Sequence, residues 1–173
     1  MNWTIFHEQV YPIRHKLFRF ALRITGCSLE AEDVVQEVLE RVWKSPESRS
    51  ESVSNWEAWC MSLTRNRSLD QVRANSRRRT LPLEGLSTQP AVSDATWTTE
   101  TRDLAEQARR LMQDLPEKQR MVMHLRDVEE LSYEEIADVL NISMEQVKVG
   151  LHRARKTIRE KMLAVEAHSA VDA

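Results

Sequence analysis

The sequence predicts an all-α protein of two small helical domains joined by a flexible linker, the C-terminal domain being a helix-turn-helix. The 173 residues include only 3 Gly and 5 Pro, whereas Leu, Glu, Arg and Ala are abundant. No stretch alternates apolar and polar residues as a half-buried strand would. One polar segment separates two helical regions, so we predict an N-terminal domain at 1–79, a linker at 80–103 and a C-terminal domain at 104–173.

The first predicted helix spans residues 4–25, where apolar side chains recur at helical spacing. These side chains are Phe6, Val10, Ile13, Leu17, Phe20 and Ile24. Pro12 lies inside this span. It should kink the helix or loosen its first turns, because proline lacks the N–H that the helix requires.

The second predicted helix spans residues 29–44 and has two distinct faces. The buried stripe consists of Val35, Val38, Leu39 and Val42. Another face carries acidic and amide side chains at i, i+3, i+4 and i+7: Asp33, Gln36, Glu37 and Glu40. Such a face is most often solvated surface, and a partner-binding face is the alternative.

A polar loop at residues 45–53 precedes a third helix, which should begin at a capping box, Ser54-x-x-Glu57, and reach about Arg77. Its second half is basic, with six Arg against one Asp between Arg65 and Arg79. Three Trp bracket the loop: Trp43, Trp56 and Trp59. Rings beside a cationic helix suit single-stranded nucleic acid, because bases stack on rings while the charge holds phosphates. A Trp at helical spacing is nevertheless more often a core residue.

The predicted linker, residues 80–103, is acidic and rich in Ser, Thr and Pro. That is the composition of a tether between domains. A long loop within one domain is the alternative, but uninterrupted loops of this length are uncommon in compact folds.

Two short capped helices near the C-terminus predict the helix-turn-helix. The first follows the capping box Ser132-x-x-Glu135 and runs from Tyr133 to about Leu140, and the second follows Ser143-x-x-Gln146. Asn141 stands in the turn where the chain needs a left-handed residue, a conformation that Asn tolerates. The second helix of such a motif can enter a DNA major groove, and a plain helical hairpin is the simpler alternative.

The faces of this second helix favour DNA binding. Its inner stripe consists of Val147, Leu151, Ala154 and Ile158, which should pack on the preceding helix. The outward face and its flanks carry Glu145, Lys148, Val149, His152, Arg153, Arg155, Lys156 and Arg159. Between Met144 and Lys161 six Lys or Arg stand against two Glu, in a chain whose formal net charge is only −2. A basic outward face is an electrostatic footprint for phosphate.

Neither catalysis nor a metal or cofactor site is predicted, because no nucleophile–base arrangement, metal cluster or phosphate-binding glycine loop occurs. Cys27 and Cys60 lack the paired spacing of a zinc or redox site and are expected to be packing residues in a reducing compartment. The longest apolar run, residues 162–165, is far shorter than the roughly 20 residues that cross a bilayer. The N-terminus also lacks the basic start of a signal peptide. We therefore expect a cytoplasmic protein without membrane insertion.

Three stretches of the chain, residues 31–43, 55–73 and 115–160, together resemble the bacterial sigma factors. The resemblance is to their small two-domain extracytoplasmic-function group, and it covers almost the whole chain outside the linker and the extreme termini. Each motif is only moderately specific, but three in the family's order and at its separations are highly specific. The short linker is also similar, since this group lacks the middle domain of the housekeeping sigma factors.

The resemblance implies a role for each surface. Asp33, Gln36, Glu37 and Glu40 would dock on the coiled coil of the largest subunit of core RNA polymerase. Residues 45–55 and the helix that follows would open the −10 promoter element and read it as single-stranded DNA. The candidates on that helix are Arg65, Asn66, Arg67, Asp70, Arg73 and Arg77, of which Arg65, Asn66 and Asp70 match the family's R-N-x-x-x-D pattern.

The helix-turn-helix would read the duplex −35 element and rest on the polymerase flap. Its candidate DNA contacts are Gln146, Lys148, Val149, His152, Arg153, Arg155 and Lys156. An anti-sigma factor is a further partner that many such factors have. The resemblance gives neither the promoter sequence nor the regulon.

The chain departs from the family pattern at two places. Where the family often has Thr-Val-Lys-Ser-Arg, residues 146–150 are Gln-Val-Lys-Val-Gly. Gly150 within the helix should cost about 1 kcal/mol, and the loss of the Ser-Arg pair leaves the −35 sequence undetermined. Asn141 also replaces a Gly that is common at the turn.

Two other classes of protein remain open from the residues themselves. An ordinary helix-turn-helix regulator would bind duplex DNA without being a polymerase subunit, but it leaves the acidic face and the Trp- and Arg-rich helix without a role. An adaptor that binds a signalling protein through its helical faces would show no salt-dependent DNA affinity.

Overall fold

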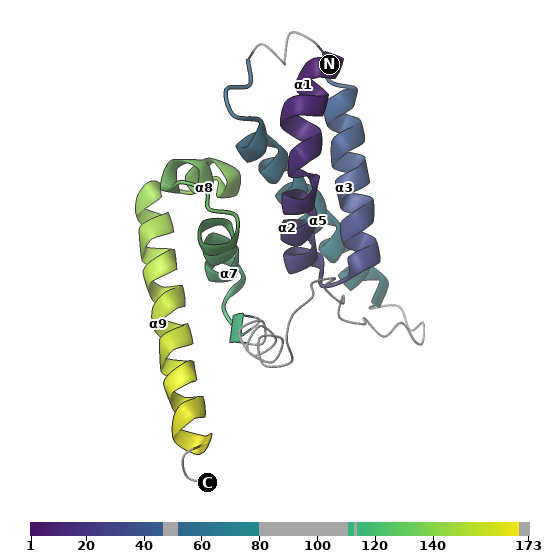
Figure 1. The fold of residues 1–173 in the computed structure, drawn as a ribbon. Coiled ribbons are helices and arrows are strands. Elements are labelled where there is room, and N and C mark those ends of the chain that lie inside the picture. Colours follow the sequence, from purple (N-terminus) through teal and green to yellow (C-terminus); the bar gives the residue numbers. More distant parts are fainter. Residues whose placement is uncertain (47–51, 80–110, 113, 170–173) are drawn as a thin grey trace. The chain divides into compact units, whose positions relative to one another are not determined.

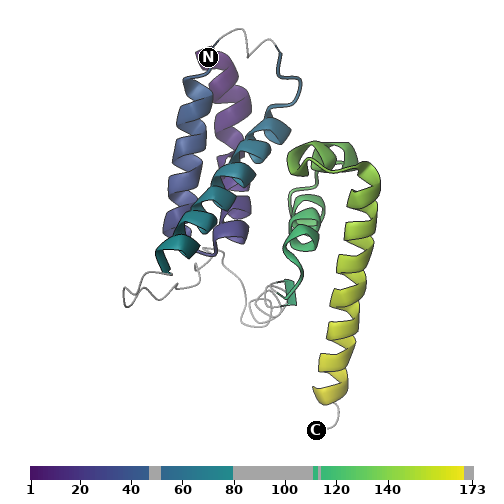
Figure 2. The same ribbon diagram turned by 180° about the vertical axis from the view of Figure 1, so that it is seen from behind.

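The structure, a computed structural model, describes residues 1–46, 52–79, 111, 112 and 114–169. These residues form helices and connecting turns, with no strand among them. They belong to two compact units, one with α1, α2, α3 and α5 and the other with α7 and α9 (Figures 1 and 2). The predicted all-α, two-domain class is confirmed. Residues 80–103, the predicted linker, lie outside the described residues.

The start of the N-terminal unit is broken around Pro12 rather than being one helix over 4–25. The chain forms α1 (Trp3–Ile5), the π-helix η1 (Phe6–Val10), the 3-10 helix η2 (Tyr11–Ile13) and α2 (Arg14–Thr25). Pro12 has no N–H to donate and its ring crowds the carbonyl four residues earlier. Ahead of Pro12 the backbone hydrogen bonds span five residues, since the Tyr11 N–H donates to the Phe6 carbonyl. Across Pro12 they span three, since the Arg14 N–H donates to the Tyr11 carbonyl. The predicted loosening at Pro12 is confirmed.

Three longer helices form the core of the N-terminal unit. α2 ends at Gly26, whose φ of +73° lets its N–H donate to the Leu22 carbonyl at 2.9 Å. α2 packs on α3 (Ser28–Trp43) and on α5 (Trp56–Arg79), and α3 also packs on α5. The buried side chains include Leu17, Phe20, Val34, Val38, Val42, Cys60 and Met61. Of the stripe predicted on α3, only Leu39 is not fully buried.

The cap of α5 differs from the prediction. The Ser54-x-x-Glu57 capping box does not form; instead the Asn55 side-chain oxygen accepts the Ala58 N–H at 2.9 Å, so Asn55 caps the helix. The Glu57 carboxylate pairs with Lys16 Nζ at 2.6 Å and ties α5 to α2. The prediction of a Ser54-x-x-Glu57 capping box was wrong because the Glu57 carboxylate pairs with Lys16, a residue far away in the sequence.

The two cysteines should differ in reactivity. Cys60 has no exposed surface, and burial raises the pKa of its thiol to about 12, whereas Cys27 is partly exposed. Because the thiolate is the reacting species, iodoacetamide at pH 8 should modify Cys27 and spare Cys60 in the folded protein. Peptide mass spectrometry measures both rates, and unfolding in guanidinium should make them similar. Equal rates in the folded protein would contradict a buried Cys60.

The C-terminal part of the chain forms α7 (Glu117–Met123), the π-helix η3 (His124–Val128), α8 (Tyr133–Leu140) and α9 (Met144–Ser169). Its buried side chains include Val122, Leu125, Ile136, Val147, Leu151 and Ala154. α8 and α9 form the predicted helix-turn-helix, and Asn141 has the predicted left-handed conformation, with φ +51°.

Both predicted capping boxes in this motif are present. The Ser132 N–H donates to the Glu135 carboxylate at 2.6 Å, and the Glu135 N–H donates to the Ser132 hydroxyl at 3.2 Å. The Ser143 N–H donates to Gln146 Oε1 at 3.0 Å, and the Gln146 N–H donates to the Ser143 hydroxyl at 3.2 Å. These reciprocal bonds satisfy N–H groups that the first helical turn leaves without partners, and so they fix where each helix begins.

Gly150 is a helical position with room for a side chain. A Cβ built there would lie 3.6 Å from Val122 Cγ2, an ordinary van der Waals contact. Gly150→Ala should therefore stabilise the protein by about 0.4–1 kcal/mol, because alanine restricts the unfolded chain and suits a helix. Denaturant unfolding of the full chain measures the change. Gly26→Ala is the contrasting variant, expected to be destabilising because of the φ of +73° there.

Candidate nucleic-acid interface

The basic face of α9 is exposed, as the sequence predicts. Val147, Leu151 and Ala154 are buried, and Ile158 is partly buried. The exposed residues of α9 include every predicted −35 candidate: Gln146, Lys148, Val149, His152, Arg153, Arg155 and Lys156. The helix thus presents its cationic side chains to solvent while its apolar stripe packs in the core.

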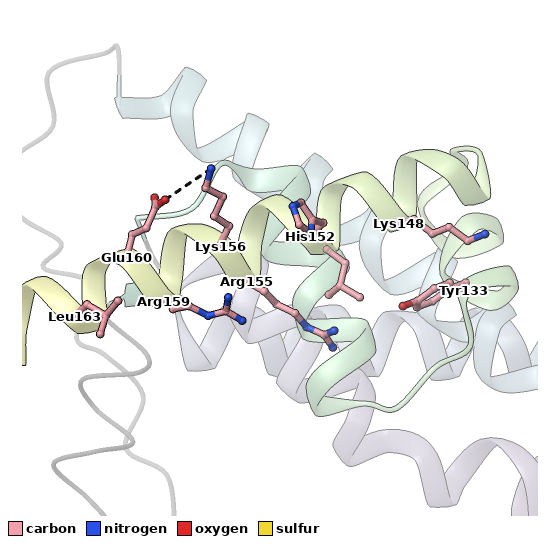
Figure 3. A pocket seen from close by; sticks show the side chains of 9 residues that line it. Tyr133, Lys148, His152, Arg155, Lys156, Arg159, Glu160 and Leu163 are labelled. Atoms are coloured by element: carbon pink, nitrogen blue, oxygen red, sulfur yellow. Dashed lines mark ion pairs between the residues drawn. The ribbon is translucent and has the colours of Figure 1, made fainter.

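A groove of about 580 Å³ follows α9 beside the start of α8 (Figure 3). Tyr133 and Lys148 lie at one end of it, and His152, Arg155 and Arg159 line it further along. Lys156 Nζ lies 3.8 Å from the Glu160 carboxylate, an exposed pair that screens part of one charge. The groove therefore combines an aromatic ring with several cations, which suits a phosphate backbone.

Arg155 is held by a residue that sequence reasoning did not identify. Its Nη2 donates to Asp127 Oδ1 at 2.5 Å and its Nε donates to Oδ2 at 3.4 Å. This bond to Asp127 raises the pKa of Arg155 above its ordinary value. Arg155 is consequently fixed on the flank of α9, with its charge partly compensated by the protein itself.

Gln146 also has an internal role. Its side-chain oxygen accepts the Ser143 N–H in the capping box, so one acceptor position of that oxygen is occupied while its NH₂ group remains free to donate to a base edge. Among the α9 candidates, Lys148, His152 and Arg153 are exposed and take part neither in that cap nor in the ion pairs of Arg155 and Lys156.

The predicted −10 candidates lie along the second half of α5. Asn66, Asp70, Arg73 and Arg77 are exposed, whereas Arg65 and Arg67 are half-buried. Neighbours on the helix contact one another: Arg65 Nη1 donates to Asn66 Oδ1 at 3.2 Å, and Arg73 Nη1 donates to Asp70 Oδ1 at 3.3 Å. These contacts are exposed and weak, so the polar groups of Asn66, Asp70 and Arg73 remain accessible to a ligand, whereas Arg65 Nε is buried.

The four predicted polymerase-binding side chains on α3 are all exposed: Asp33, Gln36, Glu37 and Glu40. Two of them have internal partners. Lys44 Nζ forms an exposed ion pair with the Glu40 carboxylate four residues earlier. Glu37 pairs with Arg67 of α5.

The Glu37–Arg67 ion pair joins two surfaces that are predicted to have separate roles. Arg67 Nη2 donates to Glu37 Oε1 at 2.7 Å and Arg67 Nε donates to Oε2, a two-pronged contact. The bond from Arg67 lowers the pKa of Glu37, and the bond to Glu37 raises the pKa of Arg67. Both groups therefore stay charged across the physiological range.

Sequence reasoning also missed an aromatic column on the N-terminal helices, formed by Trp3, His7 and Tyr11. Trp3 and His7 stack with centroids 5.8 Å apart, and His7 and Tyr11 stack at 6.4 Å. The rings recur every four residues, and this spacing was the available signal. The predicted helix over residues 4–25 rests instead on the apolar side chains between Phe6 and Ile24.

Metal-ion and membrane sites receive no support from the described part of the chain. No group of three or more His, Cys, Asp or Glu side chains there is arranged to hold a metal ion. None of the helices in the described ranges combines the length and the apolarity that a membrane crossing requires.

Two family models match the chain, one in each unit. Residues 12–78 match Sigma-70 region 2, and residues 105–158 match Sigma-70, region 4. The chain is 33% identical to the ECF RNA polymerase sigma factor SigL of Mycobacterium tuberculosis, over 83% of this chain and 80% of the relative. It is 29% identical to SigE of Mycolicibacterium smegmatis over 96% of this chain, which spans 65% of that relative's length.

The fold is also similar to a solved structure. The sigma factor RpoE of Bartonella quintana, crystallised with the anti-sigma factor NepR, superposes with a TM-score of 0.68 at 23% sequence identity. The match covers 90% of this chain and 94% of that one. This likeness concerns the fold, because the sequence identity is low.

Proposed function

Because the chain belongs to the extracytoplasmic-function group of the sigma-70 family, we propose that it binds core RNA polymerase and directs initiation at specific promoters. The observation that carries the proposal is the exposed basic face of α9 within a capped helix-turn-helix. The remaining surfaces acquire roles from this assignment.

The C-terminal unit would read the duplex −35 element. α9 is the second helix of its motif, the position that enters a major groove. Arg153 and His152 lie on its outward face, where a forked guanidinium or a ring nitrogen can meet a base edge. Arg159 and the Asp127-bound Arg155 lie toward the groove, where a phosphate is the more suitable partner.

The N-terminal unit would hold the opened −10 strand. α5 supplies Arg65, Asn66, Asp70, Arg73 and Arg77, a polar and cationic series on an exposed helix. Flipping a base out of a duplex costs a few kcal/mol, and contacts to the captured base and its phosphates offset that cost. The role of Arg67 differs, because its guanidinium already pairs with Glu37.

The acidic face of α3 would dock on core polymerase. Asp33, Gln36, Glu37 and Glu40 are exposed together on one helix, whose opposite stripe is buried. Once this face is engaged, the tethered C-terminal unit is confined near its −35 site. Its effective concentration rises, so neither unit needs to bind promoter DNA tightly by itself. This action would take place with polymerase in the cytoplasm.

An anti-sigma factor is the natural regulatory partner for this function. The structurally similar RpoE was solved with the anti-sigma factor NepR. We propose that a partner of the same class covers one or more of the polymerase and DNA surfaces of this chain and so withholds it from core polymerase.

The test is transcription in vitro by core polymerase with and without the purified chain, on fragmented genomic DNA of the source bacterium. Sequencing of the transcripts should reveal defined start sites that appear only with the chain and share upstream elements. Binding to duplex DNA without core polymerase, together with no new start sites, would indicate an ordinary helix-turn-helix regulator. No salt-dependent DNA affinity in either assay would favour the adaptor class.

A further inference from the structure

The aromatic column ends in an exposed ring. Trp3 stacks on His7 with an interplanar angle of 29°, and His7 stacks on Tyr11 at 10°. The Arg14 guanidinium covers the Tyr11 ring at 4.2 Å from its centroid, which closes that end of the column. Trp3, at the other end, is 65% exposed. Trp3 is therefore the end of the column at which a further flat ring could continue the stack.

The open end contacts two neighbouring aromatic side chains. The ring of Trp43, on the last turn of α3, meets Trp3 edge-on at 5.9 Å and Phe6 edge-on at 5.2 Å. α1 accordingly lies beside the C-terminal end of α3 (Figures 1 and 2). Trp3 thus has ring contacts that favour one position although most of its surface is accessible, and a side chain positioned in advance loses less conformational entropy on binding.

The open end of the column adjoins the segment assigned to the −10 element. The N-terminal ammonium of Met1 donates to the Ser45 carbonyl at 3.0 Å, and Ser45 is the first residue of the segment at 45–55. Lys44, the residue before Ser45, is a cation that pairs with Glu40, and Arg14 carries a charge at the far end of the column. Stacking surface and positive charge are the two requirements of a single-strand site.

We propose that Trp3 stacks an unpaired base of the promoter strand whose −10 element the N-terminal unit holds. The base would extend the series Arg14–Tyr11–His7–Trp3. The inference rests on the proposed function. It adds a base contact outside α5 and outside residues 45–55. A protein that docks on the same rings is the alternative ligand. A stack of rings with one exposed end suits a single flat base better than it suits the broad surface of a protein.

The experiment uses holoenzyme, reconstituted with the full chain, on forked promoter DNA whose non-template strand is single-stranded from the −10 element onward. A series of forks carries one abasic site at successive unpaired positions. Trp3→Ala should lower affinity for the intact fork about 5- to 100-fold, the usual range for loss of one stacked base. Trp3→Phe should recover most of it, because a ring remains. Leu29→Ala, at a side chain 72% exposed on α3, is the matched control and should have no effect.

The abasic series locates the base. At one position the abasic site should weaken wild-type holoenzyme and leave the Trp3→Ala variant unaffected, because each change removes the same contact. Equal affinities of wild type and Trp3→Ala on the intact fork would overturn the inference. So would a Trp3→Ala loss that appears equally in core polymerase binding, which would assign the column to a protein partner. Failure of wild-type holoenzyme to bind the intact fork would overturn the proposed function and, with it, this inference.

Discussion

Replacing Asp33, Glu37 and Glu40 together by alanine should weaken the affinity for core RNA polymerase at least tenfold and leave the fold intact. All three side chains are exposed, so their removal opens no cavity. Each carboxylate that meets a cationic partner can contribute about 1.5–3 kcal/mol as a charged hydrogen bond. Polymerase must first displace Arg67 from Glu37 and Lys44 from Glu40, which reduces the net free energy that these two carboxylates contribute to binding. For this reason we expect only a tenfold loss of affinity as the minimum.

A titration of fluorescent core polymerase with the triple variant measures this loss. Glu8→Ala removes an exposed carboxylate of the same unit that lies off α3, and it should bind normally. Arg67→Ala is the second control, because it frees the Glu37 carboxylate without removing it and should preserve core binding. A folded triple variant with wild-type affinity would show that polymerase binds elsewhere on the chain.

Arg153→Ala should cost about 1–3 kcal/mol of promoter affinity and relax the preference at one −35 position. Arg153 is exposed on the outward face of α9, and its guanidinium can meet the two acceptors of a guanine edge. Arg159→Ala should instead weaken binding to all sequences alike and reduce the salt slope by about 1, as loss of a phosphate contact does.

Binding of holoenzyme to a panel of −35 variants at several salt concentrations distinguishes these effects. Asp127→Ala provides a control that the structure suggests, since it releases Arg155 without altering α9 itself. Its effect should be uniform across the panel. If Arg153→Ala lost affinity uniformly as well, base recognition would pass to His152 or to the remaining NH₂ group of Gln146.

The features that follow from local sequence were predictable. Capping boxes at Ser132 and Ser143 depend on residues three apart, and both form. The left-handed Asn141 and the buried stripe of α9 likewise depend on neighbours within a few residues. The exposure of every α9 candidate and of the acidic α3 face followed from helical periodicity, because these helices lie at the surface of their units.

The remaining features depend on tertiary partners that no local pattern specifies. Glu57 fits a capping box but pairs with Lys16, 41 residues away. Arg67 fits a DNA-binding helix but binds Glu37, 30 residues away, and Arg155 binds Asp127. These side chains pair because of the way their helices pack against one another. Sequence periodicity predicts which face of a helix is buried but not which helix packs on it or at what angle. The aromatic column was in principle accessible from the spacing of Trp3, His7 and Tyr11, but its stacked geometry depends on the π-helix ahead of Pro12.

The Glu37–Arg67 pair makes the two proposed interfaces thermodynamically linked. If core polymerase engages the Glu37 carboxylate, Arg67 is released on α5, the helix proposed to contact promoter DNA. The released guanidinium then gains a phosphate partner more readily than the paired one. If polymerase binding makes the free energy of DNA binding more favourable in this way, DNA binding must make the free energy of polymerase binding more favourable by the same amount. One exposed ion pair would thus favour the ternary assembly over either binary complex, and would leave the isolated protein with a lower affinity for both.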